Sequence, residues 1–233
     1  MRSNIITSGL AIALAFSGVI APAMGQPIDR TIAQVDKTSE LDRAIAEGFR
    51  LFKEGSAESL RKAIGQFEKA LELARSAQAK DKQAFSLLAL GRLYEVLGEK
   101  QKALDYYNQA LPLWRAVGNR GMEATTLNNI GGVYDALGEK QKALDYYNQA
   151  LPLSRAVGDR DGEATTLNNI GYALNKQQPD ISIVFYKQSV NLYEALRKDI
   201  RKLPRETRET YAKSVSDTYR LLADALPCPR SHW

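Results

Sequence analysis

Residues 97–118 read LGEKQKALDYYNQALPLWRAVG, and residues 137–158 read LGEKQKALDYYNQALPLSRAVG. The two stretches lie 40 residues apart and differ only where Trp114 is matched by Ser154. A fixed period of this length is typical of stacked units, each of which needs a neighbour to bury its apolar face. The chain is therefore predicted to be a repeat protein whose function depends on a surface rather than on a catalytic pocket.

Each repeated unit carries the apolar spacing of two helices. Steps of three and four residues, which mark one face of a helix, separate Leu127, Ile130, Tyr134 and Leu137. Gly138 follows, and glycine suits the chain reversal where a helix ends. A second stripe then consists of Ala143, Tyr147, Ala150 and Leu151. Each unit is predicted to be a helical hairpin, and the chain to be all-α.

Glycine recurs at one place in the first helix of successive units, as Gly91, Gly131 and Gly171. Glycine inside a helix costs about 1 kcal/mol relative to alanine. Its recurrence therefore predicts a local gain, which is most simply a close approach of the second helix.

The order of these residues resembles the tetratricopeptide repeat, in a lengthened form similar to that of kinesin light chain. The matching positions are Leu87, Leu90, Gly91, Tyr94, Ala103, Tyr107 and Ala110 in one unit, and Leu127, Ile130, Gly131, Tyr134, Ala143, Tyr147 and Ala150 in the next. Less regular matches flank them, at Gly48, Leu51, Ala63, Phe67 and Ala70 and at Leu167, Ile170, Gly171, Leu174, Ser182, Tyr186 and Ser189. The resemblance implies an α-α superhelical solenoid of about four hairpins.

The predicted hairpins cover residues 41–80, 84–120, 124–160 and 164–200, after a lead-in at residues 26–40. A solenoid needs its last apolar face covered, and residues 201–226 carry a further helical pattern along Tyr211, Val215, Tyr219, Leu222 and Leu226. We expect this segment to be a capping helix. Residues 227–233 have no periodicity and are predicted to be an irregular tail.

A second resemblance covers residues 179–226, which are similar to the region that joins such repeats to a CHAT peptidase domain in bacterial, especially cyanobacterial, proteins. Those proteins continue into the caspase-like peptidase domain, whereas this sequence stops at Trp233. The resemblance implies an alternative function, as the truncated or split sensor half of such a peptidase, with a CHAT-type domain as partner.

The N-terminus has the pattern of a secretory signal peptide over residues 1–25. Arg2 precedes an apolar run from Ile5 to Ile20, and small residues follow up to Gly25. We expect cleavage before Gln26 and export to the periplasm or the medium. The alternative is an uncleaved N-terminal anchor, which together with the basic residues between Arg197 and Arg208 would make the chain a membrane-surface adaptor.

Composition offers little to catalysis or to nucleic-acid binding. The net charge is +5, and the basic residues between 197 and 208 have no aromatic residues among them. The single Cys and the single His, Cys228 and His232, both fall in the irregular tail. The sequence has no phosphate loop, metal-ligand cluster or nucleophile elbow. We therefore expect no enzyme activity, no cofactor, no nucleic acid and no membrane contact, and a monomer or weak oligomer.

A partner-binding groove is the remaining candidate site. In tetratricopeptide repeats the first helices line a concave groove, and the resemblance places eight residues there: Arg92, Asn128, Asn129, Asp135, Asn168, Asn169, Tyr172 and Asn175. An Asn side chain both donates and accepts, so it can pair with any peptide backbone. The alternative is that one Asn of each pair only satisfies neighbouring groups between helices. The predicted function is a non-catalytic scaffold that binds a protein or peptide.

Trp114 has two interpretations, since the fold accepts Ser154 at the matching position. It is either an exposed partner anchor, because Trp is enriched at interface hot spots, or a side chain that covers the less regular first unit.

Overall fold

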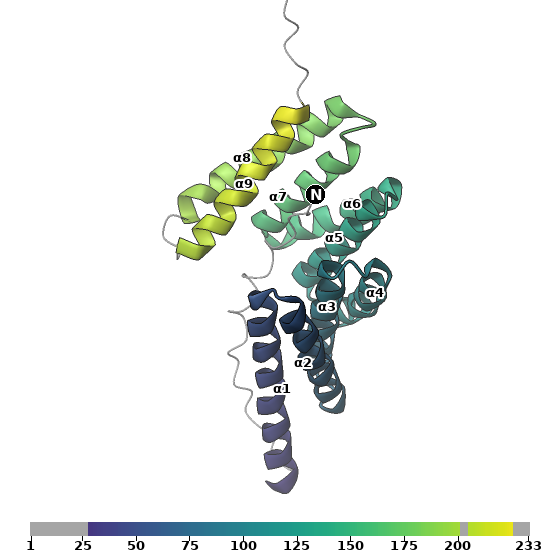
Figure 1. Ribbon diagram of the computed structural model, residues 1–233, viewed down its shortest axis with the longest axis vertical. Coiled ribbons are helices and arrows are strands. Elements are labelled where there is room, and N and C mark those ends of the chain that lie inside the picture. Colours follow the sequence, from purple (N-terminus) through teal and green to yellow (C-terminus); the bar gives the residue numbers. More distant parts are fainter. Residues whose placement is uncertain (1–27, 201–204, 226–233) are drawn as a thin grey trace, which may run out of the picture. The chain divides into compact units, whose positions relative to one another are not determined.

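The computed structural model describes residues 28–200 and 205–225, which form nine α-helices and no strand within these ranges (Figure 1). The helices are α1 (Ile28–Glu54), α2 (Ala57–Ser76), α3 (Lys80–Val96), α4 (Lys100–Ala116), α5 (Arg120–Ala136), α6 (Lys140–Val157), α7 (Arg160–Leu174), α8 (Pro179–Ile200) and α9 (Arg205–Ala225). The all-α prediction is confirmed, and so is the order of four hairpins and a final helix.

The 40-residue period is visible in the helix boundaries. First helices begin at Lys80, Arg120 and Arg160, and the second helices α4 and α6 begin at Lys100 and Lys140. Within hairpins, α1 packs on α2, α3 on α4, and α7 on α8. Successive hairpins are joined by packing of α2 on α3 and of α6 on α7, and α9 packs on α8. The fold is thus a solenoid of consecutive hairpins.

The turns inside hairpins depend on glycine. Gly98 and Gly138 adopt φ of +80° and +82°, in the left-handed region that side chains with a Cβ avoid. The helix before Gly138 ends at Ala136, so Leu137 belongs to the turn and is 43% exposed. Its assignment to the apolar helix face was wrong, because the helix ends at Ala136, two residues before the left-handed Gly138.

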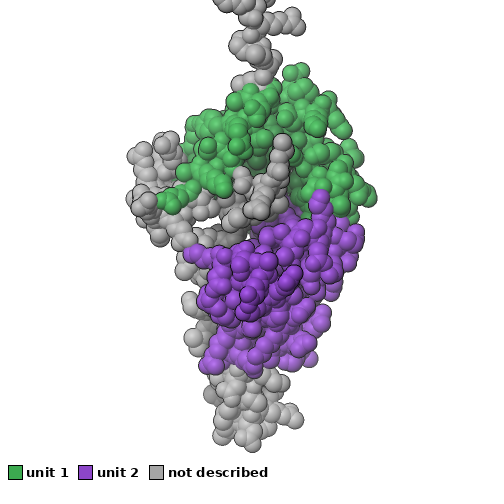
Figure 2. Space-filling view, viewed as in Figure 1, with its two compact units in different colours: residues 1–15, 130–233 green, residues 16–129 purple. Residues whose placement is uncertain are grey.

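The chain divides into two compact units, with the boundary between Asn129 and Ile130 inside α5 (Figure 2). We call the described residues 28–129 the N-terminal unit and the described residues from Ile130 onward the C-terminal unit. Each unit has a core of its own. In the C-terminal unit, for example, Tyr147 and Ile170 are buried in one cluster, against which Phe185 packs.

The recurrent helix glycines lie directly under an aromatic ring. A Cβ added to Gly91 would lie 2.4 Å from Cε1 of Tyr107 in the N-terminal unit. In the C-terminal unit a Cβ on Gly131 would lie 2.5 Å from the ring of Tyr147, and one on Gly171 would lie 2.9 Å from that of Tyr186. Close approach of the second helix is therefore the reason for the glycines, as the sequence predicts.

Trp114 is 1% exposed and belongs to the core of the N-terminal unit. The interpretation as an exposed partner anchor is therefore wrong. On α9, Thr218 and Ala225 are buried, whereas Tyr219 is 42% exposed and its hydroxyl contacts the carboxylate of Glu194. The α9 helix packs on α8, as expected of a cap, although Tyr219, predicted for its apolar face, is largely exposed.

Several predictions concern residues outside the described ranges. These are the signal peptide, the tail with Cys228 and His232, and Leu226. The side chains of the basic residues from Arg197 to Arg208 and of Tyr211 also lie outside the description. Within the described helices, none is long and apolar enough to cross a membrane.

Candidate functional site

In the N-terminal unit the predicted groove residues differ in accessibility. Asn128 on α5 is half-buried, but Asn129 is only 7% exposed. Arg92 on α3 forms an ion pair with Glu95, with 3.2 Å between Nη1 and Oε2, and their side chains are 15% and 9% exposed. The structure thus places Arg92 beside an acid that compensates its charge, and leaves Asn128 as the more accessible amide.

Glu95 has a second partner in this unit. The Tyr107 hydroxyl donates a hydrogen bond to Oε2 of Glu95 at 2.7 Å, which ties α4 to α3. Burial, together with the neighbouring Glu95 carboxylate, raises the pKa of Tyr107 well above its ordinary value. The phenol therefore stays protonated and acts as a structural donor.

In the C-terminal unit, three predicted or neighbouring residues form one cluster. Lys140 Nζ lies 2.6 Å from Oδ1 of Asp135 and 4.8 Å from the ring centroid of Tyr172. The side chains of Asp135 and Lys140 are 12% and 29% exposed, and Tyr172 is 51% exposed. The acid and the base compensate each other, so the cluster presents an aromatic side chain rather than an unbalanced charge.

The Asn residues of this unit have different environments. Asn168 is half-buried, and its Oδ1 is a buried atom with no hydrogen-bond partner among the residues that the structure describes. Asn169 is also half-buried. Asn175, at the end of α7, accepts a long hydrogen bond of 3.4 Å from the hydroxyl of Ser182. Of the three amides, Asn168 has a buried acceptor that the described part of the chain does not use.

Tyr186 on α8, which is not among the predicted groove residues, has an unusual environment. Its side chain is 0% exposed, and its hydroxyl has no hydrogen-bond partner within the described ranges. Burial raises its pKa, and the nearby Tyr172, Asp135 and Asp224 act in the same direction. The sequence did contain a signal: Asn175 stands at the position where the earlier units have Glu95 and Asp135.

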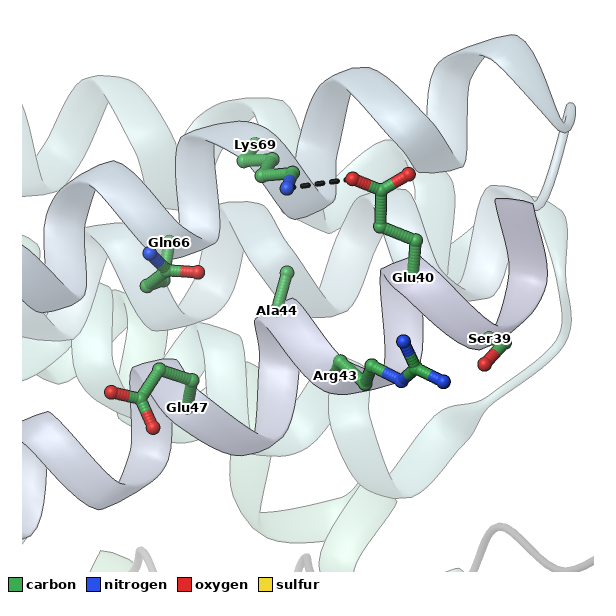
Figure 3. Close-up of a pocket in the computed structure, with 7 residues that line it drawn as sticks. All are labelled: Ser39, Glu40, Arg43, Ala44, Glu47, Gln66 and Lys69. Atoms are coloured by element: carbon green, nitrogen blue, oxygen red, sulfur yellow. Dashed lines mark ion pairs between the residues drawn. The ribbon is translucent and has the colours of Figure 1, made fainter. Parts of the chain in front are cut away.

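A separate pocket of about 490 Å³ lies between α1 and α2 in the N-terminal unit. It is lined by Ser39, Glu40, Arg43, Ala44, Glu47, Gln66 and Lys69. Figure 3 shows the Glu40 carboxylate directed at Lys69, with which it forms an ion pair of 2.7 Å. Glu47 is paired with Arg50 on the same helix. Acids and bases surround the buried side chain of Ala44 in this pocket, and it contains none of the predicted groove residues.

In the described part of the chain, no group of three or more His, Cys, Asp or Glu side chains is placed to hold a metal ion. The chemistry of the site therefore consists of amides, phenols and compensated ion pairs. These groups can form hydrogen bonds and aromatic contacts.

Solved structures show where this fold occurs elsewhere. Aspartyl phosphate phosphatase F from Bacillus subtilis is 16% identical, with 85% of this chain and 52% of that chain covered and a TM-score of 0.62. A Rap protein complexed with competence and sporulation factor is 17% identical, with 80% and 52% covered and a TM-score of 0.57. This chain thus spans about half the length of either protein.

A structure described as a kinesin light chain with nearly identical TPR-like repeats, from Podosopora anserina, is also similar. It is 13% identical, with 82% of this chain and 89% of that chain covered and a TM-score of 0.48. A comparison with curated proteins found no match. The resemblance of residues 179–226 to the region before a CHAT peptidase domain stays a prediction.

The repeats themselves match a family model. The tetratricopeptide repeat model matches residues 56–116, 101–156 and 122–195, which together make up more than half of the sequence. These matches run from α2 to α8 and include every predicted groove residue. The chain therefore belongs to the tetratricopeptide repeat family.

Proposed function

We propose that the protein is a non-catalytic interaction scaffold, and that it binds an extended peptide segment of a partner through the first helices of its repeats. The observation that carries the proposal is on α7, where Asn168 has a buried acceptor without a partner in the described ranges and Tyr172 is 51% exposed. An unpaired buried acceptor is unfavourable in the free protein, and a ligand that donates a hydrogen bond removes that cost.

A peptide is the ligand class that fits these groups best. Every peptide unit except proline supplies an N–H donor, which Asn168 Oδ1 can accept. The exposed aromatic side chain of Tyr172 lies one helical turn further along α7, where it can pack against a ligand side chain. Among proteins of the same fold, a Rap protein has been crystallised with competence and sporulation factor, which supports a ligand-binding role for this type of solenoid.

A binding experiment tests the proposal. The purified chain is screened against an array of synthetic peptides with blocked ends, and the best peptide is titrated by calorimetry. We expect Asn168→Ala to weaken binding by about 0.5–1.5 kcal/mol, which is about 2- to 10-fold in Kd. We expect Tyr172→Ala to weaken it by at least as much, because Tyr is enriched among interface hot spots.

The matched control is Asn148→Ala, which removes an exposed Asn from the second helix α6. It is expected to bind the peptide as tightly as the unmodified chain. The proposal would be contradicted if the chain bound no peptide of the array. It would also be contradicted if the Asn168→Ala, Tyr172→Ala and Asn148→Ala variants all bound the peptide with the same affinity. Thermal melts of each variant separate a loss of binding from a loss of folded protein.

We also propose that the chain is exported. The support is the sequence of residues 1–25, with its basic start, apolar run and small residues before Gln26.

Expression in a bacterium followed by N-terminal sequencing of the exported fraction is expected to give Gln26 as the first residue. The variant Leu14→Arg interrupts the apolar run and is expected to keep the chain in the cytoplasm. An intact Met1 on soluble cytoplasmic protein would rule out export, and an intact Met1 in the membrane fraction would indicate an uncleaved anchor.

A further inference from the structure

We propose that the buried phenol of Tyr186 is a ligand-binding group, which donates a hydrogen bond to a backbone carbonyl of the peptide on α7. This inference rests on the proposed function and extends it to a second point of contact. It assigns the ligand a chemistry: an extended, uncharged peptide segment read through its backbone.

The first step is that packing against the helix glycine does not require this hydroxyl, and that no described residue pairs with it. The matching Tyr107 donates to Glu95 at 2.7 Å, so its hydroxyl connects two helices. In the first hairpin the same position is Phe67, which is 1% exposed. Its ring packs against Gly48 in the way that the tyrosine rings pack against the later helix glycines. A phenyl ring is therefore sufficient for packing. Tyr186 keeps a hydroxyl that is buried and has no partner in the described residues, at a cost in free energy.

The second step concerns the acceptors around Tyr186. Asn175 occupies the position of Glu95, but Tyr186 forms no hydrogen bond with it in the described residues. The Ser182 hydroxyl lies 3.4 Å from Oδ1 of Asn175 and donates over a shorter distance, 3.0 Å, to the carbonyl of Pro179. Asp135, which acts electrostatically on Tyr186, is paired with Lys140 at 2.6 Å. Asp224 on α9 and Tyr172 act on it in the same way, and burial is the largest cause of its raised pKa. The phenol is thus held in its protonated form, as a donor.

The third step is the spacing of the two unpaired groups. The Tyr107 hydroxyl reaches the first-helix residue four positions after Gly91. We infer the same direction for Tyr186, toward Asn175, because its ring packs on Gly171 in the same way. Asn168 and Asn175 are seven residues apart, which is about 10 Å along a helix. An extended peptide covers that distance with about three residues, so one segment can donate to Asn168 and accept from Tyr186.

The fourth step is that the cluster of Asp135, Lys140 and Tyr172 does not favour a charged ligand. Lys140 is compensated by Asp135 and covered by the Tyr172 ring, so it is a poor receptor for a free carboxylate. Tyr172 is half exposed, and rotation of an exposed side chain is fast. Tyr172 is near enough to Tyr186 to act on it electrostatically, and the proposal requires that movement of the exposed Tyr172 side chain lets a ligand reach the buried hydroxyl. The expected ligand is therefore an internal, uncharged stretch of a partner rather than its terminus.

The test compares Tyr186→Phe with the matched variant Tyr107→Phe, in the full chain, using the array peptide with blocked ends. Tyr186→Phe is expected to keep or raise the melting temperature, because it removes an unpaired hydroxyl, and to weaken peptide binding about 2- to 10-fold. Tyr107→Phe is expected to lower the melting temperature, because it breaks the bond to Glu95, and to leave peptide affinity unchanged.

A second variant tests the same point from the opposite direction. Asn175→Glu gives Tyr186 the acceptor that Glu95 gives Tyr107, and is expected to weaken peptide binding about 2- to 10-fold by engaging the phenol. A lower melting temperature for Tyr186→Phe would overturn the inference, since the hydroxyl would then have a structural role. Unchanged peptide affinity in Tyr186→Phe would overturn it while leaving the proposed function intact. If no array peptide binds the unmodified chain, the proposed function fails and this inference fails with it.

Discussion

Replacement of Trp114 by alanine is expected to lower the free energy of unfolding by about 3–5 kcal/mol. The side chain is 1% exposed in the N-terminal unit, so its removal leaves a large cavity that the surrounding helices cannot fully close. Domains of this size have about 5–15 kcal/mol of stability in total. The variant should therefore unfold at a much lower denaturant concentration. Chemical denaturation followed by circular dichroism measures the change.

The repeat itself supplies the control for this experiment. Ser154 occupies the matching place in α6 and is 2% exposed. Ser154→Ala is expected to change stability by about 1 kcal/mol or less, because it removes one small hydroxyl. Ser154→Trp is expected to destabilise the chain by about 1–3 kcal/mol, because a closely packed site is overfilled. If Trp114→Ala unfolds at the same denaturant concentration as Ser154→Ala, Trp114 is not a core residue.

The helices could be predicted from the sequence because residues 97–118 and 137–158 repeat the same pattern. The repeat shows where each hairpin begins and which residues correspond. In these two units the helix glycine packs against the tyrosine 16 residues later, Gly91 against Tyr107 and Gly131 against Tyr147. The reversal at Gly138 was predicted correctly, but the end of the helix at Ala136 was not, and Leu137 was assigned to the wrong environment for that reason. The apolar residues keep a spacing of three and four up to Leu137, but Leu137 lies beyond the end of the helix and is not buried.

The candidate site was predictable only in part. The pattern of the family indicates which helix face points inward, but it does not indicate which side chains there are already satisfied. Asn129 is 7% exposed, and the charge of Arg92 is compensated by Glu95. Tyr186 was counted as a packing residue, since it aligns with Tyr107. Only the hydrogen-bond environment distinguishes these two tyrosines, and that depends on whether a carboxylate from another helix is within reach.

The contact between helix glycine and aromatic ring makes a second large effect testable. Gly91→Ala would place a Cβ 2.4 Å from Cε1 of Tyr107, far inside van der Waals contact. The ring is 0% exposed and its hydroxyl is held by Glu95, so it cannot move aside cheaply. Overpacking of this kind costs about 1–3 kcal/mol and sometimes more, and the better helix propensity of alanine returns only about 1 kcal/mol. A net loss of stability is expected by denaturant titration, and a larger one for Gly91→Val.

Gly65 on α2 is the control that separates packing from backbone propensity. A Cβ at Gly65 would have no atom within 4 Å, so Gly65→Ala gains helix propensity without a clash. It is expected to stabilise the chain by about 0.5–1 kcal/mol. The two substitutions are chemically identical and both lie inside a helix, so opposite signs are the result expected from the Tyr107 ring that packs on Gly91. If Gly91→Ala also stabilised the chain, the second helix would have room to move outward. The recurrent glycines would then need a different explanation from close helix approach.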